Sequence, residues 1–266
     1  MMSLPLPVPA SSPHAGQLAV LTALSLSMLA LVGAWALADT RLLNGAPVWA
    51  KPAKFALSFA VMFGTLALVA RRLSPQWRDG RTLRITVAVM AAAMIFEMAY
   101  MIFMAARQDA SHFNFSTRFT ETMYSLMGLG AVSLMVGVLV FGVVALRDAA
   151  AAFGPALRWS VGWGFIQSFV ATLVTAGYMS SAGTHVGVAP EGAATLPLLG
   201  WSGAVGDIRP AHFLALHAMQ VLPLAGFLFD RLGVGVRPMR WVAAAYAALT
   251  AAVFAQALGG MPLIRM

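Results

Sequence analysis

Long apolar stretches alternate with short polar connections along almost the whole chain. Seven of these stretches are close to the roughly 20 mostly apolar residues that a membrane-spanning helix needs. Charged residues, Pro or Gly stand at most of their ends, as they do at the ends of membrane helices. The pattern predicts an all-α fold, a polytopic membrane helix bundle with seven transmembrane helices at 18–38, 52–70, 83–106, 119–146, 156–180, 210–229 and 239–260.

The connections between these stretches contain no hydrophilic region long enough for a second domain, and no internal repeat is visible. We therefore expect a single transmembrane domain over residues 18–266. Residues 1–17 are rich in Pro and carry no Lys or Arg, so they are expected to form an extended lead-in. The first apolar segment ends in Ala36-Leu37-Ala38, which resembles a signal-peptidase site, but it lacks a basic region before it. We expect it to remain as the first helix; the alternative is cleavage, after which six helices remain with the same orientation.

The composition agrees with this interpretation. Hydrophobic residues make up 60% of the chain and charged residues only 10%, with a mean hydropathy of +0.81, which excludes a soluble enzyme and a disordered chain. Cysteine is absent, so disulfides and thiolate metal sites are excluded. The net charge of +8 comes from short basic runs between apolar stretches, which points to the lipid bilayer as the partner and to no nucleic acid.

The orientation follows from Lys and Arg in the connections. One side carries ten of them, at Arg71, Arg72, Arg78, Arg81, Arg84, Arg147, Arg158, Arg231, Arg237 and Arg240. The other side carries seven, at Arg41, Lys51, Lys54, Arg107, Arg118, Arg209 and Arg265. The first side is expected to be cytoplasmic. We therefore expect a bacterial inner-membrane protein with its N-terminus in the cytoplasm, its C-terminus outside, and the 181–209 connection facing outward.

Ionisable residues inside a membrane are the most informative ones, because each costs at least ~2.5–3.5 kcal/mol at the bilayer centre. Glu97 lies deep in the third stretch, and His217 and Gln220 lie deep in the sixth. Glu97 and His217 are expected at a similar depth, so we predict that both face the interior and come close enough to interact. The alternative is that each satisfies a neighbouring backbone or hydroxyl group separately.

Further polar residues continue from that level toward the outer helix ends. Together they predict an outward-facing pocket formed by Lys54, Glu97, Tyr100, His112, Glu121, Asp207, Arg209, His212, His217 and Gln220. The alternative for Lys51, Lys54 and Arg118 is that they extend to the lipid headgroups. The Gly-rich 181–209 connection is either mobile or a lid over this pocket.

Several chemistries fit these residue types. Glu97, His212 and His217 could supply ligands for a metal ion, although the two histidines point about 140° apart on one helix. A haem could be held by His217 with Met98 or Met101, and a Met stripe could bind Cu(I), although such a stripe more often packs. A proton-coupled carrier would use Glu97 and His217 as a relay.

Four motifs carry a resemblance: Lys51-Pro-Ala-Lys54-Phe55, Glu97-Met-Ala-Tyr100, Ser111-His112-Phe-Asn114, and the run from Gly206-Asp207 through His212 and His217 to Gln220. With them, the chain resembles a family of bacterial multi-pass inner-membrane proteins over about residues 45–230. The resemblance implies a multi-pass membrane protein and transfers no activity and no catalytic residue. In helix number and polar groups the chain is also similar to seven-helix zinc-dependent lipid hydrolases, but it lacks their HxxxH pair.

The sequence therefore predicts a pocket that binds a metal ion, haem or quinone-like ligand, with redox or hydrolytic chemistry as an option. The alternatives are a proton-coupled transporter of a small solute and a non-catalytic membrane subunit that docks a partner. The residues assign no reaction and no catalytic group. A small-molecule or lipidic ligand is the expected occupant in the leading interpretation.

Overall fold

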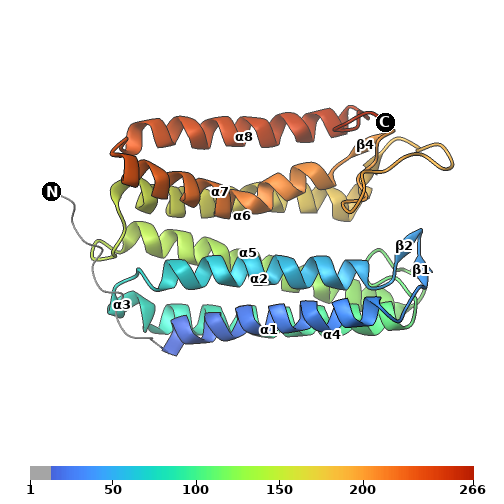
Figure 1. Ribbon diagram of the computed structural model, residues 1–266, viewed down its shortest axis with the longest axis horizontal. Helices are drawn as coiled ribbons and strands as arrows, with labels where there is room; N and C mark the ends of the chain where they lie inside the picture. Colours follow the sequence, from blue (N-terminus) through green and yellow to red (C-terminus); the bar gives the residue numbers. More distant parts are fainter. Residues whose placement is uncertain (1–12) are drawn as a thin grey trace. The chain divides into compact units, whose positions relative to one another are not determined.

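The computed structural model describes residues 13–266, and these fold into helices joined by short loops and two-residue strands (Figure 1). The helices are α1 (Pro13–Ala36), α2 (Ala50–Ala70), α3 (Pro75–Arg78), α4 (Arg81–Ala106), α5 (Arg118–Arg147), α6 (Pro155–Ala182), α7 (Arg209–Leu232) and α8 (Val236–Leu258). Strand β1 (Leu42–Leu43) pairs antiparallel with β2 (Ala46–Pro47), and β3 (His185–Val186) pairs antiparallel with β4 (Gly206–Asp207).

The all-α class is confirmed, and each of the seven apolar stretches corresponds to one long helix whose ends differ from the predicted ends by a few residues. Within residues 13–266, six helices are long and apolar enough to cross a membrane: α1 from Gly16, α2, α4, α5, α7 and α8. Helix α6 is long enough at 28 residues, but residues such as Gln167, Ser168 and Thr172 make it more polar. A multi-pass membrane protein is supported, and a seventh span is not confirmed.

The chain forms two compact units, and each is described by itself. Unit 1 ends at Ala152, and unit 2 is Phe153–Met266. The predicted lead-in over residues 1–17 falls largely on residues 1–12, which lie outside the described residues, whereas residues 13–17 belong to α1. A single domain over residues 18–266 stays a prediction.

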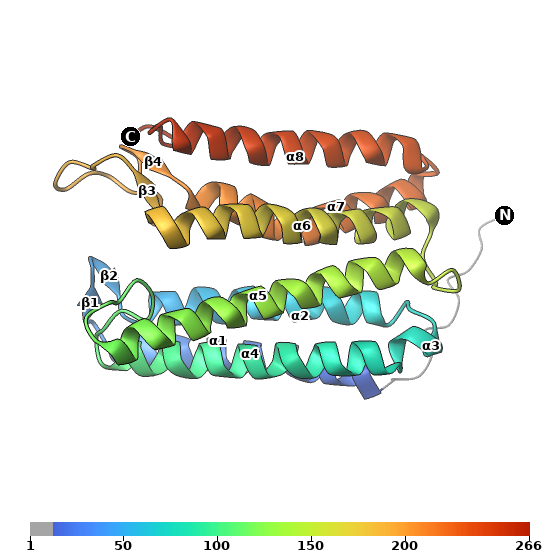
Figure 2. The same cartoon turned by 180° about the vertical axis from the view of Figure 1, so that it is seen from behind.

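Unit 1 is built from α1, α2, α4 and α5, with α1 packed on α2 and α4 packed on α5. Figures 1 and 2 both show the β1–β2 hairpin beside the α4–α5 loop, and we call this end of the unit its β1–β2 end. Arg41 donates a hydrogen bond to the Ala106 carbonyl at 3.1 Å, and Gln108 donates one to the Leu42 carbonyl at 2.7 Å. These contacts fix the loop after α4 against the hairpin before α2.

Unit 2 is built from α6, α7 and α8, and α6 and α7 pack closely along their length. Small residues make this approach possible, as in many membrane helix pairs. An ideal Cβ at Gly164 of α6 would lie 3.0 Å from the Leu222 Cβ, and one at Gly226 of α7 would lie 2.8 Å from the Ala156 carbonyl oxygen. The Asp230 carboxylate accepts the backbone N–H groups of Ala156 and Leu157 at the start of α6, at 2.9 and 2.8 Å.

Candidate functional site

Glu97 is a buried carboxylate in the interior of unit 1, where its side chain is only 2% exposed. It lies nine residues before the end of α4, which places it roughly 13 Å from that end at 1.5 Å per residue. Its Oε1 atom has no hydrogen-bond partner among residues 13–266. An ideal Cβ at Gly130 of α5 would lie 2.8 Å from this atom, so glycine there lets the carboxylate reach the α5 backbone.

Tyr100 follows Glu97 by one turn on α4, so the two side chains share a face of the helix. Its hydroxyl group is also buried and also without a hydrogen-bond partner in the described part of the chain. The residue packs in a cluster with three buried thioether side chains, those of Met101, Met104 and Met127. The Glu97 Oε1 atom and the Tyr100 hydroxyl, both without a hydrogen-bond partner within residues 13–266, therefore lie in largely apolar surroundings.

Lys51 brings positive charge to this region from the first turn of α2. Its ammonium group interacts electrostatically with both Glu97 and His112. Phe55, one turn further along α2, packs on the His112 ring with 5.9 Å between the centroids. Lys51, Glu97, Tyr100 and His112 are called the Glu97 cluster below. It combines a carboxylate, a cation, a phenol and an imidazole toward the β1–β2 end of unit 1.

His112 lies in the α4–α5 loop, between the rings of Phe55 and Tyr124, and its centroid is 6.1 Å from that of Tyr124. Burial, with the Lys51 ammonium as a second cause, lowers the pKa of His112 to about 3. The ring is therefore neutral at physiological pH, with one nitrogen as donor and the other as acceptor. Its Nδ1 lies 3.1 Å from the Ser111 hydroxyl.

Two residues predicted for the pocket lie elsewhere on unit 1. Lys54 is exposed in the second turn of α2, and Glu121 is exposed in the first turn of α5. Unit 1 therefore brings Glu97 and His112 near Lys51, holds Tyr100 on the same face of α4 as Glu97, and leaves Lys54 and Glu121 at its surface.

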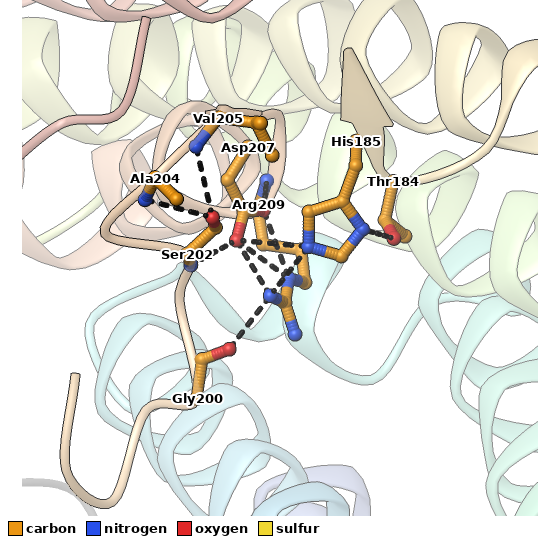
Figure 3. A network of polar contacts seen from close by, with 8 residues as sticks. All are labelled: Thr184, His185, Gly200, Ser202, Ala204, Val205, Asp207 and Arg209. Atoms are coloured by element: carbon orange, nitrogen blue, oxygen red, sulfur yellow. Dashed lines mark hydrogen bonds and ion pairs between the residues drawn. The ribbon is translucent and has the colours of Figure 1, made fainter. Parts of the chain in front are cut away.

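Unit 2 holds the other five predicted residues, and Asp207 and Arg209 form a polar network in the α6–α7 connection (Figure 3). The Asp207 side chain is fully buried and accepts hydrogen bonds from the Ser202 backbone N–H at 2.9 Å and from Arg209 Nε at 2.8 Å. Arg209 Nη2 also donates to the Gly200 carbonyl at 2.7 Å. Burial alone would raise the pKa of Asp207, but the Arg209 and Ser202 hydrogen bonds outweigh it and hold the pKa below its usual value.

His212 lies in the first turns of α7 and faces α6, where its Nδ1 is 2.9 Å from the Thr175 hydroxyl. Thr172, one turn before Thr175, is 4% exposed, and its hydroxyl has no partner within residues 13–266. Ser168, one turn before Thr172, donates a hydrogen bond to the Leu216 carbonyl at 3.0 Å. A stripe of hydroxyl side chains on α6 therefore meets α7.

His217 lies about 140° around α7 from His212, as its spacing of five residues requires, and Gln220 follows His217 by three residues. His217 Nδ1 is 3.2 Å from Gln220 Oε1, and its ring centroid is 4.1 Å from that of Phe213. The predicted approach of Glu97 and His217 joins residues of different units and stays a prediction.

The described residues include no three His, Asp or Glu side chains placed to hold one metal ion. The candidate ligands Glu97, His212 and His217 fall in separate units, and Thr175 and Gln220 already contact the Nδ1 atoms of the two histidines. Metal binding by these residues therefore has no support.

Some residues of these clusters were not apparent from the sequence. Gly130 resembles any other glycine of an apolar helix until the Glu97 carboxylate is placed against it. His185 is a single histidine in a Gly-rich connection, yet its Nε2 lies 3.1 Å from Arg209 Nη2. Thr172 and Thr175 did carry a signal, because hydroxyl residues three apart on a predicted helix share one face.

Comparisons with models of known protein families, with curated proteins and with solved structures each gave no match to this chain.

Proposed function

We propose that unit 1 binds a lipid-soluble, quinone-like ligand at the Glu97 cluster. The observation that carries this proposal is the pair of buried, unsatisfied polar atoms on one face of α4, Glu97 Oε1 and the Tyr100 hydroxyl. A buried polar group without a partner costs about 1–3 kcal/mol, and most such groups in native proteins are satisfied. A bound molecule that donates to Glu97 and accepts from Tyr100 would remove this cost.

The surroundings favour a flat apolar molecule with oxygen atoms at its edge. Met101, Met104 and Met127 pack around Tyr100 and offer adaptable apolar contacts. Lys51 and the neutral ring of His112 add donors for carbonyl oxygens. Quinones and quinols have this combination of an apolar ring and polar edges. They also dissolve in the bilayer from which such a site would be filled.

The proposed setting is a bacterial inner membrane crossed seven times, with α6 as the seventh span beside the six apolar helices. The Lys and Arg distribution supports a cytoplasmic N-terminus and an extracytoplasmic C-terminus. The β1–β2 end of unit 1 then faces outward, and the Glu97 cluster lies in the outer half of the membrane. The motif resemblance to bacterial multi-pass proteins is part of this proposal.

The test is binding of decylubiquinol, the reduced form whose hydroxyl groups can donate to Glu97 and accept from Tyr100, to the purified protein in lipid nanodiscs under reducing conditions, monitored by quenching of tryptophan fluorescence. Trp49 lies directly before α2 and two residues from Lys51, so it reports on this region. We expect saturable quenching by the wild type. Glu97→Gln and Tyr100→Phe should each weaken binding about tenfold, which corresponds to about 1.4 kcal/mol for one lost hydrogen bond.

Matched controls are Glu121→Gln, an exposed carboxylate of α5, and Tyr178→Phe, a tyrosine of unit 2. Both should bind the probe as the wild type does. Quenching that never saturates, or an equal loss in Glu97→Gln and Glu121→Gln, would overturn the proposal. The rival functions, a proton-coupled transporter and a docking subunit, would then take its place.

A further inference from the structure

The connection between α6 and α7 is folded rather than open, and one histidine adds side-chain contacts to the backbone pairing of its first strand with its last. His185 in β3 faces Asp207 in β4 across the antiparallel pair. Its Nε2 lies 3.1 Å from Arg209 Nη2 and 3.6 Å from Asp207 Oδ2, and its Nδ1 lies 3.0 Å from the Thr184 hydroxyl. Figure 3 shows the imidazole between Thr184 on one side and Arg209 with Asp207 on the other.

These contacts fix the protonation state of the ring. A guanidinium group can only donate hydrogen bonds, so the His185 nitrogen facing Arg209 must be an acceptor. The ring is therefore neutral, with its proton on Nδ1, from where it donates to the Thr184 hydroxyl. A second proton would have to sit on Nε2. It would abolish the hydrogen bond from Arg209 and place two cations 3.1 Å apart.

We propose that His185 makes the α6–α7 connection an acid-sensitive clasp, closed when the imidazole is neutral and opened when it is protonated. This inference is independent of the proposed function, because all its residues lie in unit 2 and none belongs to the Glu97 cluster.

The charged groups that act on His185 are Asp207 and Arg209, both from the other side of the clasp. The end of α8 and the segment after it also lie against this connection: Ala257 and Gly260 pack beside Gly206, and the Met266 N–H donates to the Gly203 carbonyl at 3.1 Å. Arg265 and the terminal carboxylate are the charged groups of that segment. Burial lowers the pKa of His185, Asp207 acts in the opposite direction, and Arg209 lowers it further, so the pKa lies below the usual value. The closed state therefore binds a proton less readily than the open state, and acid favours opening.

Opening should release one strand and not the whole connection. The pKa of Asp207 is held below its usual value, so the ion pair between Asp207 and Arg209 survives in mild acid. Ser202 also remains hydrogen-bonded to Asp207. Strand β3 and the segment after it are therefore the part that separates, while β4 stays attached to the start of α7.

The experiment is hydrogen exchange of the β3 and β4 amides in the intact protein in nanodiscs, compared at about pH 7.5 and about pH 5, on either side of the ordinary histidine pKa. His185→Gln retains an acceptor for Arg209 but cannot be protonated, so the clasp should stay closed at both values. His185→Lys carries a permanent charge and should be open at both. The wild type should match His185→Gln at the higher pH and move toward His185→Lys at the lower.

Comparing variants at the same pH removes the intrinsic effect of pH on exchange. We expect the protection factors of the β3 amides in the wild type, divided by those in His185→Gln at the same pH, to fall by up to about tenfold for each pH unit below about 6.5. His217→Gln removes a histidine of unit 2 outside the clasp and should keep the wild-type response. Equal protection of the wild type and His185→Gln at both pH values would overturn the proposal, as would loss of the response in His217→Gln.

Discussion

At the scale of single residues, His112 should be a histidine that stays neutral in acid. Its pKa of about 3 lies below the usual value, with burial as the main cause, so the folded protein binds this proton less readily than the unfolded one. The stability that the neutral ring provides is fully present above about pH 6.5 and is lost as the pH falls toward the folded-state pKa. Its ring packs against Phe55 and Tyr124, and the Lys51 ammonium adds to the cost of a charged imidazole there.

NMR of the protein labelled with ¹⁵N-histidine in detergent micelles checks this prediction. The resonances lost in His112→Asn should keep neutral-imidazole shifts from about pH 8 down to about pH 4.5. The thermal stability of that variant should also fall less steeply than that of the wild type as the pH is lowered over this range. Titration of these resonances near pH 6.5 would contradict the burial argument.

Some residues of the candidate site can be predicted from the sequence and others cannot. The free-energy cost of a charge in the membrane is enough to identify Glu97 as a candidate site residue and to predict that it faces the interior of the helix bundle. It does not distinguish Lys51 from Lys54, because both stand near the start of α2 and their distance from Glu97 depends on how α2 and α4 pack. Gly130 is beyond sequence reasoning for the same reason, since its role exists only where α5 meets the carboxylate.

At the scale of elements, the close pairing of α6 and α7 depends on Gly226. An added Cβ would lie 2.8 Å from the Ala156 carbonyl oxygen, which is backbone and cannot turn away. We expect Gly226→Ala to destabilise unit 2 by about 1–3 kcal/mol, as overpacked sites generally do. Gly177→Ala is the matched control, because a Cβ at that α6 position meets nothing within 4 Å.

Thermal unfolding in detergent, followed by circular dichroism, compares these two variants. Gly177→Ala should unfold at the wild-type temperature or slightly above it, because alanine favours helix over glycine. Gly226→Ala should unfold several degrees lower. A shared melting temperature for the two variants would mean that α6 and α7 can separate without cost at this point.

Elements longer than a few turns were well predicted from hydrophobic pattern alone, because membrane helices must be long and apolar. The single turn of α3 and the two-residue strands were missed, since so few residues show no periodicity. The clasp in the α6–α7 connection was not predicted either. Its strands are held by His185, Asp207 and Arg209 across the connection, and such contacts leave no local pattern.

At the scale of the whole molecule, the open question with the clearest test is whether α6 crosses the membrane. In the described part of the chain, residues 13–266, six helices are apolar enough to cross by themselves, whereas α6 carries Gln167, Ser168, Thr172 and Thr175. Ser168, Thr172 and Thr175 are buried, so α6 presents them to its neighbours and not to lipid. A helix with such a buried polar stripe can cross the membrane when a close partner covers it, and α7 packs along α6.

Alkaline-phosphatase fusions, which are active only outside the cytoplasm, test this topology. With seven spans and a cytoplasmic N-terminus, fusions after residues 75, 150 and 235 should be inactive, and a fusion after residue 190 should be active. The fusions after 150 and 190 flank α6 and therefore isolate its crossing from that of every other helix. Inactivity of both would mean that α6 stays on the cytoplasmic side. Activity after 75 and inactivity after 190 would reverse the orientation and place the Glu97 cluster in the inner half of the membrane.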